Sequence, residues 1–198
     1  MQLGLKNNPN SRKLHFQLGV LQALAGQFDT AREEFRRLRR LAPAQDLPVA
    51  ALELADMQQN EESIQELRRN LKAKGNSAIL SYLLGSSLVR KGAQPGTPEY
   101  AEARRCFRRA IQLDPKLPYP YIEMGKMYEQ QGKIAEAISL FERVTVLGFH
   151  DAAPYYHLAR DYHKLNQTEK ATQMLKKVKE IERQSREFEQ VGLTAPDA

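Results

Sequence analysis

The chain has 198 residues, of which 41% are hydrophobic and 27% charged, and its formal net charge is +6. This hydrophobic content is too high for an intrinsically disordered chain and is sufficient for a substantial core. No stretch approaches the roughly 20 apolar residues that cross a bilayer, the first ten residues do not resemble a secretion signal, and a single cysteine excludes an internal disulfide framework. Because glycine and proline are few and strong helix formers are abundant, an all-α fold is expected.

In chain order, the helical pattern begins with an incomplete element and continues as five units of two helices each. Residues 1–11 are predicted to be the tail of a preceding second helix, because Pro9 stands one full repeat before Pro43. We therefore expect the chain to begin inside a longer protein. The predicted units cover residues 12–43, 44–77, 78–117, 118–151 and 152–183, and residues 184–198 are predicted to form the end of a capping helix and a flexible C-terminus.

The units share a spacing of small and large residues. Each first helix carries a small residue, namely Gly19, Ala51, Gly85, Gly125 and Ala159. The second helices carry another, namely Ala31, Ser63, Ala103, Ala137 and Ala171, twelve positions later in every unit except the third, where the interval is 18. Four residues further on stand Phe35, Leu67, Phe107, Phe141 and Leu175. Since helices cross closely only where a side chain is nearly absent, this spacing predicts tightly packed helical hairpins.

With this spacing the sequence resembles the tetratricopeptide repeat family, whose repeat is about 34 residues long. The pattern is clearest in QLGVLQALAGQFDTAREEFRRLRRLAP, EMGKMYEQQGKIAEAISLF and HLARDYHKLNQTEKATQML, and the resemblance covers roughly residues 12–183. It implies a right-handed α-solenoid of about five helix-turn-helix hairpins with a C-terminal capping helix extension. It also implies a non-catalytic scaffold that binds other proteins, with the first helix of each hairpin lining a concave surface.

Three segments depart from the regular pattern. The second unit is shortened and has Ala50 and Leu67 at positions where larger or aromatic residues are usual, which predicts the least stable unit. The third carries six extra residues, and Thr97 before Pro98 predicts a helix start that follows a protruding loop at residues 92–96. The last helix, from near Thr168, continues through KKVKEIERQSREFEQ. A terminal cap with a polar outer face is favoured there over a partner-binding coiled coil.

No motif in the sequence predicts catalysis, a cofactor or a small-molecule substrate. The four histidines, His15, His150, His157 and His163, lack the close spacing of a metal site, and His15 is expected to be a partly buried structural residue. Cys106 lies beside Phe107 within a helix, so a small packing residue is favoured over a nucleophile. No glycine-rich phosphate loop or serine elbow is present. We therefore expect a protein that is not an enzyme.

The family resemblance predicts which residues line a peptide-binding groove. They are Phe16, Val20, Leu52, Tyr82, Ser86, Val89, Ile122, Lys126, Glu129, Tyr156, Arg160 and His163. The first half of this set is apolar and the second half is polar and basic. The hypothesis is a protein or peptide ligand with an apolar segment and an acidic end, the latter bound by Lys126 and Arg160. The alternative is that the apolar half packs against neighbouring repeats or a sister subunit.

Basic residues also recur at one register of the second helices. These residues, which we call the basic ladder, are Arg36, Arg37, Arg68, Arg69, Arg108, Arg109, Arg143, Lys176 and Lys177. One interpretation is binding of an acidic partner or of nucleic acid phosphates along the convex face. A solvated helix face with internal pairs such as Glu33 with Arg37 is favoured, because no aromatic residues interleave with the ladder for base stacking. The sequence does not indicate a compartment.

Overall fold

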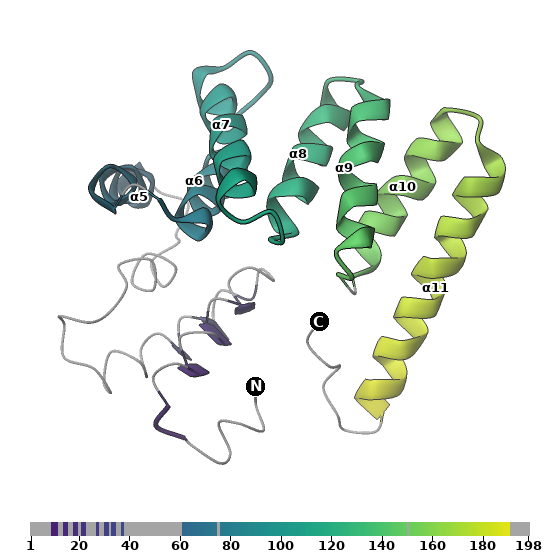
Figure 1. Ribbon diagram of the computed structural model, residues 1–198, viewed down its shortest axis with the longest axis horizontal. Helices are drawn as coiled ribbons and strands as arrows, with labels where there is room; N and C mark the ends of the chain where they lie inside the picture. The colour runs from purple at the N-terminus through teal and green to yellow at the C-terminus, as the bar shows by residue number, and fades with distance from the viewer. Residues whose placement is uncertain are drawn as a thin grey trace. The chain divides into compact units, whose positions relative to one another are not determined.

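A computed structural model describes residues 9–11, 61–74, 76–149 and 151–190, together with positions 14, 15, 18, 19, 21, 22, 27, 30, 31, 33, 34 and 37. All regular structure in these residues is helical (Figure 1). The shortened segment at residues 44–60, Phe35 and Ala51 lie outside the described residues, so the predicted weakness of the second unit stays a prediction. The predicted boundaries between units also stay predictions.

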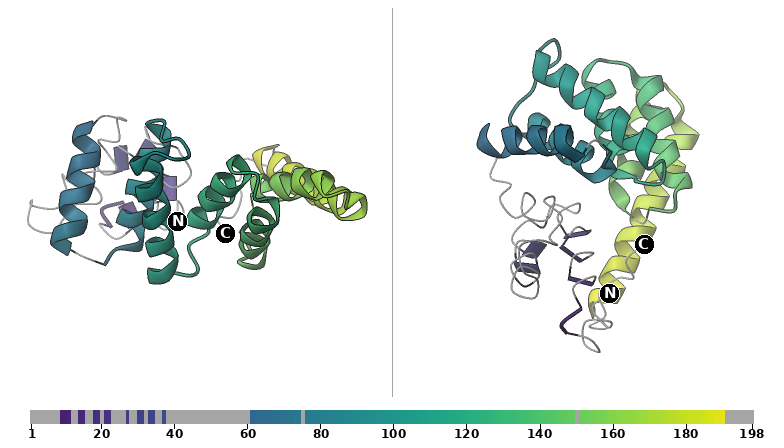
Figure 2. Two further views of the ribbon diagram at one scale, coloured as in Figure 1. Left: turned by 90° about the horizontal axis from the view of Figure 1, so that it is seen from above. Right: turned by 60° about the vertical axis from the view of Figure 1, so that its left-hand side comes forward.

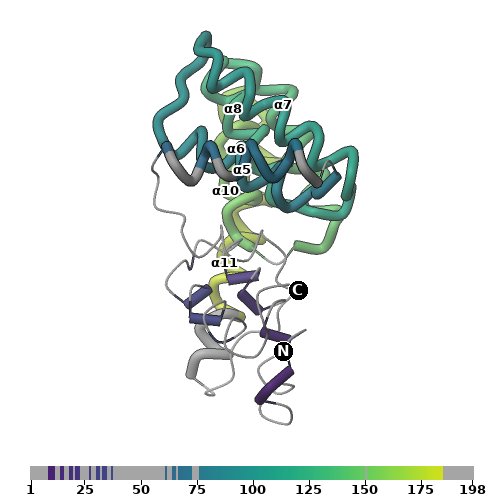
Figure 3. Tube along the Cα trace, turned by 90° about the vertical axis from the view of Figure 1, so that its left-hand side faces the viewer, coloured from purple at the N-terminus to yellow at the C-terminus, as the bar shows by residue number. Residues whose placement is uncertain are grey.

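The chain divides into two compact units, residues 1–113 and 114–198, which we call the N-terminal and C-terminal units. The N-terminal unit contains α5 (Glu61–Lys74), α6 (Ala78–Arg90) and α7 (Pro98–Leu113). Here α6 packs against both α5 and α7, and Figure 3 shows these helices from the side. The C-terminal unit contains α8 (Tyr119–Gln130), α9 (Ile134–Val146), α10 (Ala152–Lys164) and α11 (Thr168–Gln190). Each of these helices packs against the next one in the chain (Figures 1 and 2).

Helix boundaries follow the local signals in the sequence. The hydroxyl oxygen of Thr97 accepts a hydrogen bond of 3.2 Å from the backbone N–H of Tyr100, which confirms the predicted start of α7. The loop before it turns at Gly92 and Gly96, whose φ angles of 102° and 95° are readily adopted only by glycine. The predicted long terminal helix is also confirmed, since α11 extends over 23 residues.

The small residues permit close contact between the two helices of a hairpin. A Cβ atom added to Gly85 on α6 would lie 2.7 Å from the ring of Phe107 on α7. In the next hairpin, a Cβ atom added to Gly125 on α8 would lie 2.6 Å from the ring of Phe141 on α9. Both phenylalanine rings are fully buried. The predicted spacing thus corresponds to an aromatic ring seated against a glycine, where any larger residue would collide.

The equivalent residue of the last hairpin has a different environment. Phe141 is covered by the next first helix, because the ring of His157 on α10 stacks on it at 4.7 Å between centroids and 15° between planes. Leu175 on α11 occupies the corresponding register but is 45% exposed. Among the described residues no further first helix follows α11, so no equivalent ring covers Leu175. The spacing rule therefore predicts the position of this side chain but not its burial.

His15 is buried, as expected of a structural histidine. Its Nδ1 lies 2.5 Å from Oε2 of Glu34, which is also buried, and its Nε2 donates to the carbonyl oxygen of Pro9 at 2.8 Å. Both ring nitrogens of His15 and the carboxylate of Glu34 therefore have polar partners within this part of the chain. This matters because an unpaired buried polar group would destabilise the fold.

The hydroxyl of Tyr162 on α10 donates a hydrogen bond of 2.5 Å to Glu142 on α9. Burial, together with the neighbouring Glu142 carboxylate, raises the pKa of Tyr162 to about 12. Because this pKa lies above that of the unfolded chain, about 10, the stabilisation is complete below pH 10 and is lost as the pH rises towards 12. In an ultraviolet titration of phenolate absorbance, Tyr162→Phe should therefore remove a tyrosine ionisation step near pH 12. Glu142→Gln should move that step to lower pH, and an unchanged step would contradict this assignment.

Candidate binding face on helices α8 and α10

The predicted groove residues fall in three places. Phe16, Val20 and Leu52 lie outside the described residues. In the N-terminal unit, Tyr82, Ser86 and Val89 lie on α6. In the C-terminal unit, Ile122, Lys126 and Glu129 lie on α8, and Tyr156, Arg160 and His163 lie on α10. The residues of the C-terminal unit thus come from the first helices of two consecutive hairpins.

Two of the predicted apolar contacts are enclosed by the fold. Tyr82 is buried, and its ring centroid lies 6.1 Å from that of Phe107 with a tilt of 43°. Ile122 is also buried, whereas Ser86 and Val89 are partly exposed. The aromatic anchor expected at Tyr82 is therefore part of the packing between α6 and α7. Tyr156, by contrast, is 56% exposed, and it is the exposed tyrosine among the described residues of the predicted groove.

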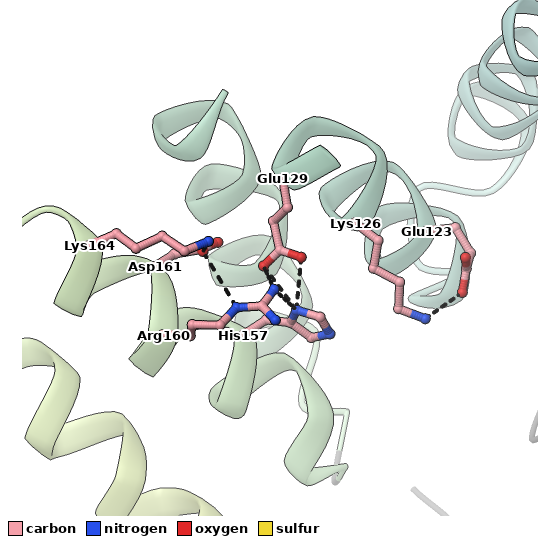
Figure 4. A network of polar contacts seen from close by, with 7 residues as sticks. All are labelled: Glu123, Lys126, Glu129, His157, Arg160, Asp161 and Lys164. Carbon is pink, nitrogen blue, oxygen red and sulfur yellow. Dashed lines mark hydrogen bonds and ion pairs between the residues drawn. The ribbon is translucent and has the colours of Figure 1, made fainter. Parts of the chain in front are cut away.

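A polar cluster connects α8 to α10 in the C-terminal unit (Figure 4). The Glu129 carboxylate lies 2.6 Å from the guanidinium of Arg160 and 2.9 Å from Nδ1 of His157. Burial raises the pKa of Glu129, but the hydrogen bonds from Arg160 and His157 outweigh burial and hold this pKa below its ordinary value. Glu129 is therefore an ionised acid that fixes the position of Arg160.

Asp161 lies beneath the same cluster and is fully buried. Its Oδ1 accepts a hydrogen bond of 3.2 Å from Lys164 and lies 4.0 Å from Nε of Arg160, while its Oδ2 has no hydrogen-bond partner among the described residues. Burial is the main cause that raises the pKa of Asp161 above its ordinary value, and the nearby Glu129 carboxylate is the second. The sequence does not predict His157, Asp161 or Lys164 as members of this cluster. Their spacing of three or four positions around Arg160 or one another on α10 is the available signal.

The cations of this face are more exposed than the acids that pair with them. The side chains of Lys126, Arg160 and Lys164 are 42%, 44% and 44% exposed, whereas those of Glu123, Glu129 and Asp161 are 20%, 9% and 0% exposed. Glu123 pairs with Lys126 at 2.8 Å, also within this face (Figure 4). We call these six residues, with His157, the charged face. It directs positive charge towards solvent and keeps negative charge beneath it.

The basic ladder is partly neutralised by pairs within the chain. Arg37 pairs with Glu34 rather than with Glu33 as expected, at 3.4 Å, and the guanidinium of Arg68 makes hydrogen bonds of 2.9 and 2.6 Å to Glu102. Arg109 donates to Asn76, and Lys177 pairs with Glu180 at 2.8 Å. Arg69, Arg108, Arg143 and Lys176 are exposed, and Arg36 lies outside the described residues. The favoured interpretation of a solvated, internally paired helix face agrees with these contacts.

No candidate chemical centre emerges from the described parts of the chain. Burial raises the pKa of the Cys106 thiol to about 11, so the thiol is protonated near neutral pH, as expected of a packing residue. Where the structure is described, no group of three or more histidine, cysteine, aspartate or glutamate residues could hold a metal ion. Within those same residues, no helix has the length and apolarity needed to cross a membrane.

Comparison with known families assigns the repeats. Models described as tetratricopeptide repeats match residues 4–46 and 152–185, and one described as a TPR repeat matches residues 99–132. Together these matches cover more than half of the 198 residues. The chain belongs to the tetratricopeptide repeat family. The resemblance found in the sequence is thereby confirmed, as is the all-α fold of helical hairpins.

Solved structures of MamA proteins share this tetratricopeptide repeat fold. One, "Crystal structure of MamA protein", has 21% identity and a TM-score of 0.58, with 90% of this chain and 95% of that chain covered. Another, "Crystal structure of MamA", has 21% identity and a TM-score of 0.61, covering 85% and 96%. "MamA RS-1 ArsTM double mutant" has 17% identity and a TM-score of 0.59, covering 87% and 94%. At these identities the likeness shows the fold alone. No curated protein matches the sequence.

The family membership and fold support a protein–protein interaction scaffold. Tetratricopeptide repeats are typically non-enzymatic. Their stacked hairpins present extended surfaces to partner proteins. The family therefore suggests proteins as the partners of this chain, and the charged face is the candidate binding site.

Proposed function

We propose that this chain is a scaffold that binds a segment of a partner protein, and that the charged face of α8 and α10 receives an acidic group of that segment. The observation that carries the proposal is the difference in exposure between the paired charges. Each of the three cations is close to half exposed, while each acid that pairs with it is more deeply buried. A ligand approaching this face therefore meets ammonium and guanidinium groups before it meets carboxylates.

Arg160 is the residue best prepared for such a ligand. Glu129 engages one side of its guanidinium, so the side chain is already ordered before a partner arrives. A guanidinium has five N–H donors in a planar fork, and the exposed part of Arg160 retains donors for a second carboxylate. An ordered donor loses less conformational entropy on binding, which favours affinity.

The apolar part of the ligand is proposed to contact Tyr156. This ring is 56% exposed on α10 and lies four positions before Arg160, on the same side of the helix. Exposed aromatic side chains supply much of the buried contact area in peptide recognition. The proposed ligand thus carries an apolar residue followed or preceded by an acidic one. Within the N-terminal unit taken by itself, Ser86 and Val89 on α6 stay predicted ligand contacts, whereas Tyr82 contributes packing.

The experiment uses the full chain and a fluorescein-labelled peptide with leucines next to a run of aspartate and glutamate. Lys126→Glu combined with Arg160→Glu should weaken binding by about tenfold or more, because two attractive charges become repulsive. Fluorescence anisotropy measures this affinity, and a peptide with asparagine and glutamine in place of the acids should bind the original chain weakly. Equal affinity for both peptides would refute the role of charge.

The matched control is Lys177→Glu combined with Lys176→Glu, which makes the same charge change on exposed positions of the second helix α11. This variant should keep the affinity of the original chain within about twofold, since its charges lie off the proposed face. Circular dichroism should show unchanged helical content in both double variants. A loss of binding in the α11 variant alone would instead favour binding of the partner along the basic ladder. Binding of the chain to RNA at low salt would favour that alternative in its nucleic acid form.

A further inference from the structure

The carboxyl group of Asp161 is poorly matched to a negative charge. It is fully buried, and an ionised carboxylate presents two acceptor oxygens. Lys164 donates to Oδ1 at 3.2 Å, but Oδ2 has no hydrogen-bond partner among the described residues. A buried ionised group with one unsatisfied oxygen is strongly disfavoured, and such groups commonly retain a proton instead.

The charges around Asp161 do not compensate for this burial. On its own helix, Lys164 is the closer cation, because Arg160 is 4.0 Å away and makes its short contact with Glu129. From α8, Glu129 contributes a second carboxylate that acts on Asp161. From α9, Glu142 accepts the hydrogen bond of Tyr162, and from α11, Lys170 lies over the ring of Tyr162. Asp161 thus faces the like charge of Glu129 and two cations, of which Lys164 lies at 3.2 Å and Arg160 at 4.0 Å, and the guanidinium of Arg160 is shared with Glu129.

One proton on Asp161 would remove both the buried negative charge of this carboxyl group and the repulsion between the carboxylates of Asp161 and Glu129. Two carboxylates cannot hydrogen-bond to each other, because each has only acceptors. A protonated Asp161 can donate to the Glu129 carboxylate, with which its side chain interacts. We propose that Asp161 holds a proton shared with Glu129, and that binding of an acidic segment at the charged face is coupled to this proton.

The direction of the pKa shifts agrees with this arrangement. Burial and the neighbouring Glu129 raise the pKa of Asp161, whereas Arg160 and His157 lower that of Glu129 despite its burial. The proton therefore belongs on Asp161 and the negative charge on Glu129. The two groups titrate as a pair, as interacting carboxyls do.

The proton changes what the charged face offers to a ligand. When Asp161 is protonated, Lys164 no longer faces an anion and its ammonium group can engage a carboxylate of the partner. A bound anion nearby in turn favours the protonated form of Asp161. Binding should therefore take up protons where Asp161 is partly ionised, and affinity should fall as the pH rises through its titration. This coupling rests on the proposed function, whereas the position of the proton does not.

The first experiment needs no ligand. Carbon-13 NMR of the aspartate carboxyl groups should show one resonance, absent in Asp161→Asn, that titrates above the ordinary aspartate pKa of about 3.9. Glu129→Gln should lower that pKa, because it removes the neighbouring negative charge. If the Asp161 resonance titrates at or below the ordinary value, the proposal is wrong whether or not any peptide binds.

The second experiment measures the coupling with the acidic peptide described above. Titration calorimetry in two buffers of different ionisation enthalpy should reveal proton uptake by the original chain and none by Asp161→Asn. That variant resembles the protonated acid and should bind at neutral pH at least as tightly as the original chain. Absence of proton uptake by the original chain across the titration range would overturn the coupling. Failure of the peptide to bind at all would refute the proposed function. The NMR titration would still decide whether Asp161 holds the proton.

The matched control for the Asp161→Asn variant is Asp151→Asn, at the N-cap position directly before α10. Asp151 is an exposed N-cap whose side chain accepts from the backbone N–H of Ala153 at 2.7 Å. Asparagine caps helices about as well as aspartate, so the fold should be retained. Proton uptake on binding should persist in this variant. Its loss would show that a general change in charge, rather than the Asp161 proton, is responsible.

Discussion

Replacing Phe141 with alanine is expected to lower the free energy of unfolding of the C-terminal unit by about 3–5 kcal/mol. The ring is fully buried between the backbone of α8 at Gly125 and the imidazole of His157. Neither neighbour can fill the space that the ring leaves, because glycine has no side chain and His157 is held by Glu129. Urea unfolding followed by circular dichroism measures the effect.

Leu175→Ala is the matched control for this prediction. Leu175 occupies the same register in the following hairpin but is 45% exposed. Its loss should lower the free energy of unfolding by at most about 1 kcal/mol, since less apolar area leaves contact with the protein. Equal effects of the two substitutions would show that the register, rather than cover from the next helix, determines the contribution.

Gly125→Val is expected to destabilise the C-terminal unit by about 1–3 kcal/mol, although valine is the better helix former. The new Cβ atom would lie 2.6 Å from the ring of Phe141, which is fully buried. Thermal and urea unfolding should both show the loss. Combining Gly125→Val with Phe141→Leu should destabilise the unit less than the sum of the two single changes, because the smaller side chain relieves the collision. Strict additivity would contradict this account of the contact.

The contacts that the sequence predicts well depend on residues close together in the chain. Gly125 and Phe141 lie within one hairpin, as do Gly85 and Phe107, so a spacing rule identifies both partners. Thr97 is identified by the neighbouring proline alone. Such features follow from helix geometry and capping, which need no knowledge of distant packing.

The features that the sequence predicts poorly depend on how separate helices pack. The position of Tyr82 suggests an open groove residue, yet its ring packs against Phe107. Lys126, Glu129 and Arg160 are all predicted to line the groove, but the pairing of Glu129 with Arg160 is not, and Glu123 and Asp161 are not in the predicted set. Glu129 reaches Arg160 across 31 positions of sequence, and only the packing of α8 beside α10 makes that contact possible. The burial of Asp161 likewise arises from several helices together.

His157 takes part in two kinds of contact at once. One face of its imidazole stacks on Phe141 of the preceding hairpin, while its Nδ1 lies 2.9 Å from Glu129 at the charged face. In a repeat protein, stability is approximately a sum of terms for each hairpin and for each junction between neighbours. His157 belongs to such a junction. A ligand that reorganises Glu129 would therefore alter the cooperativity with which adjacent hairpins unfold, and occupancy of the face would be detectable as a change in the steepness of the unfolding transition.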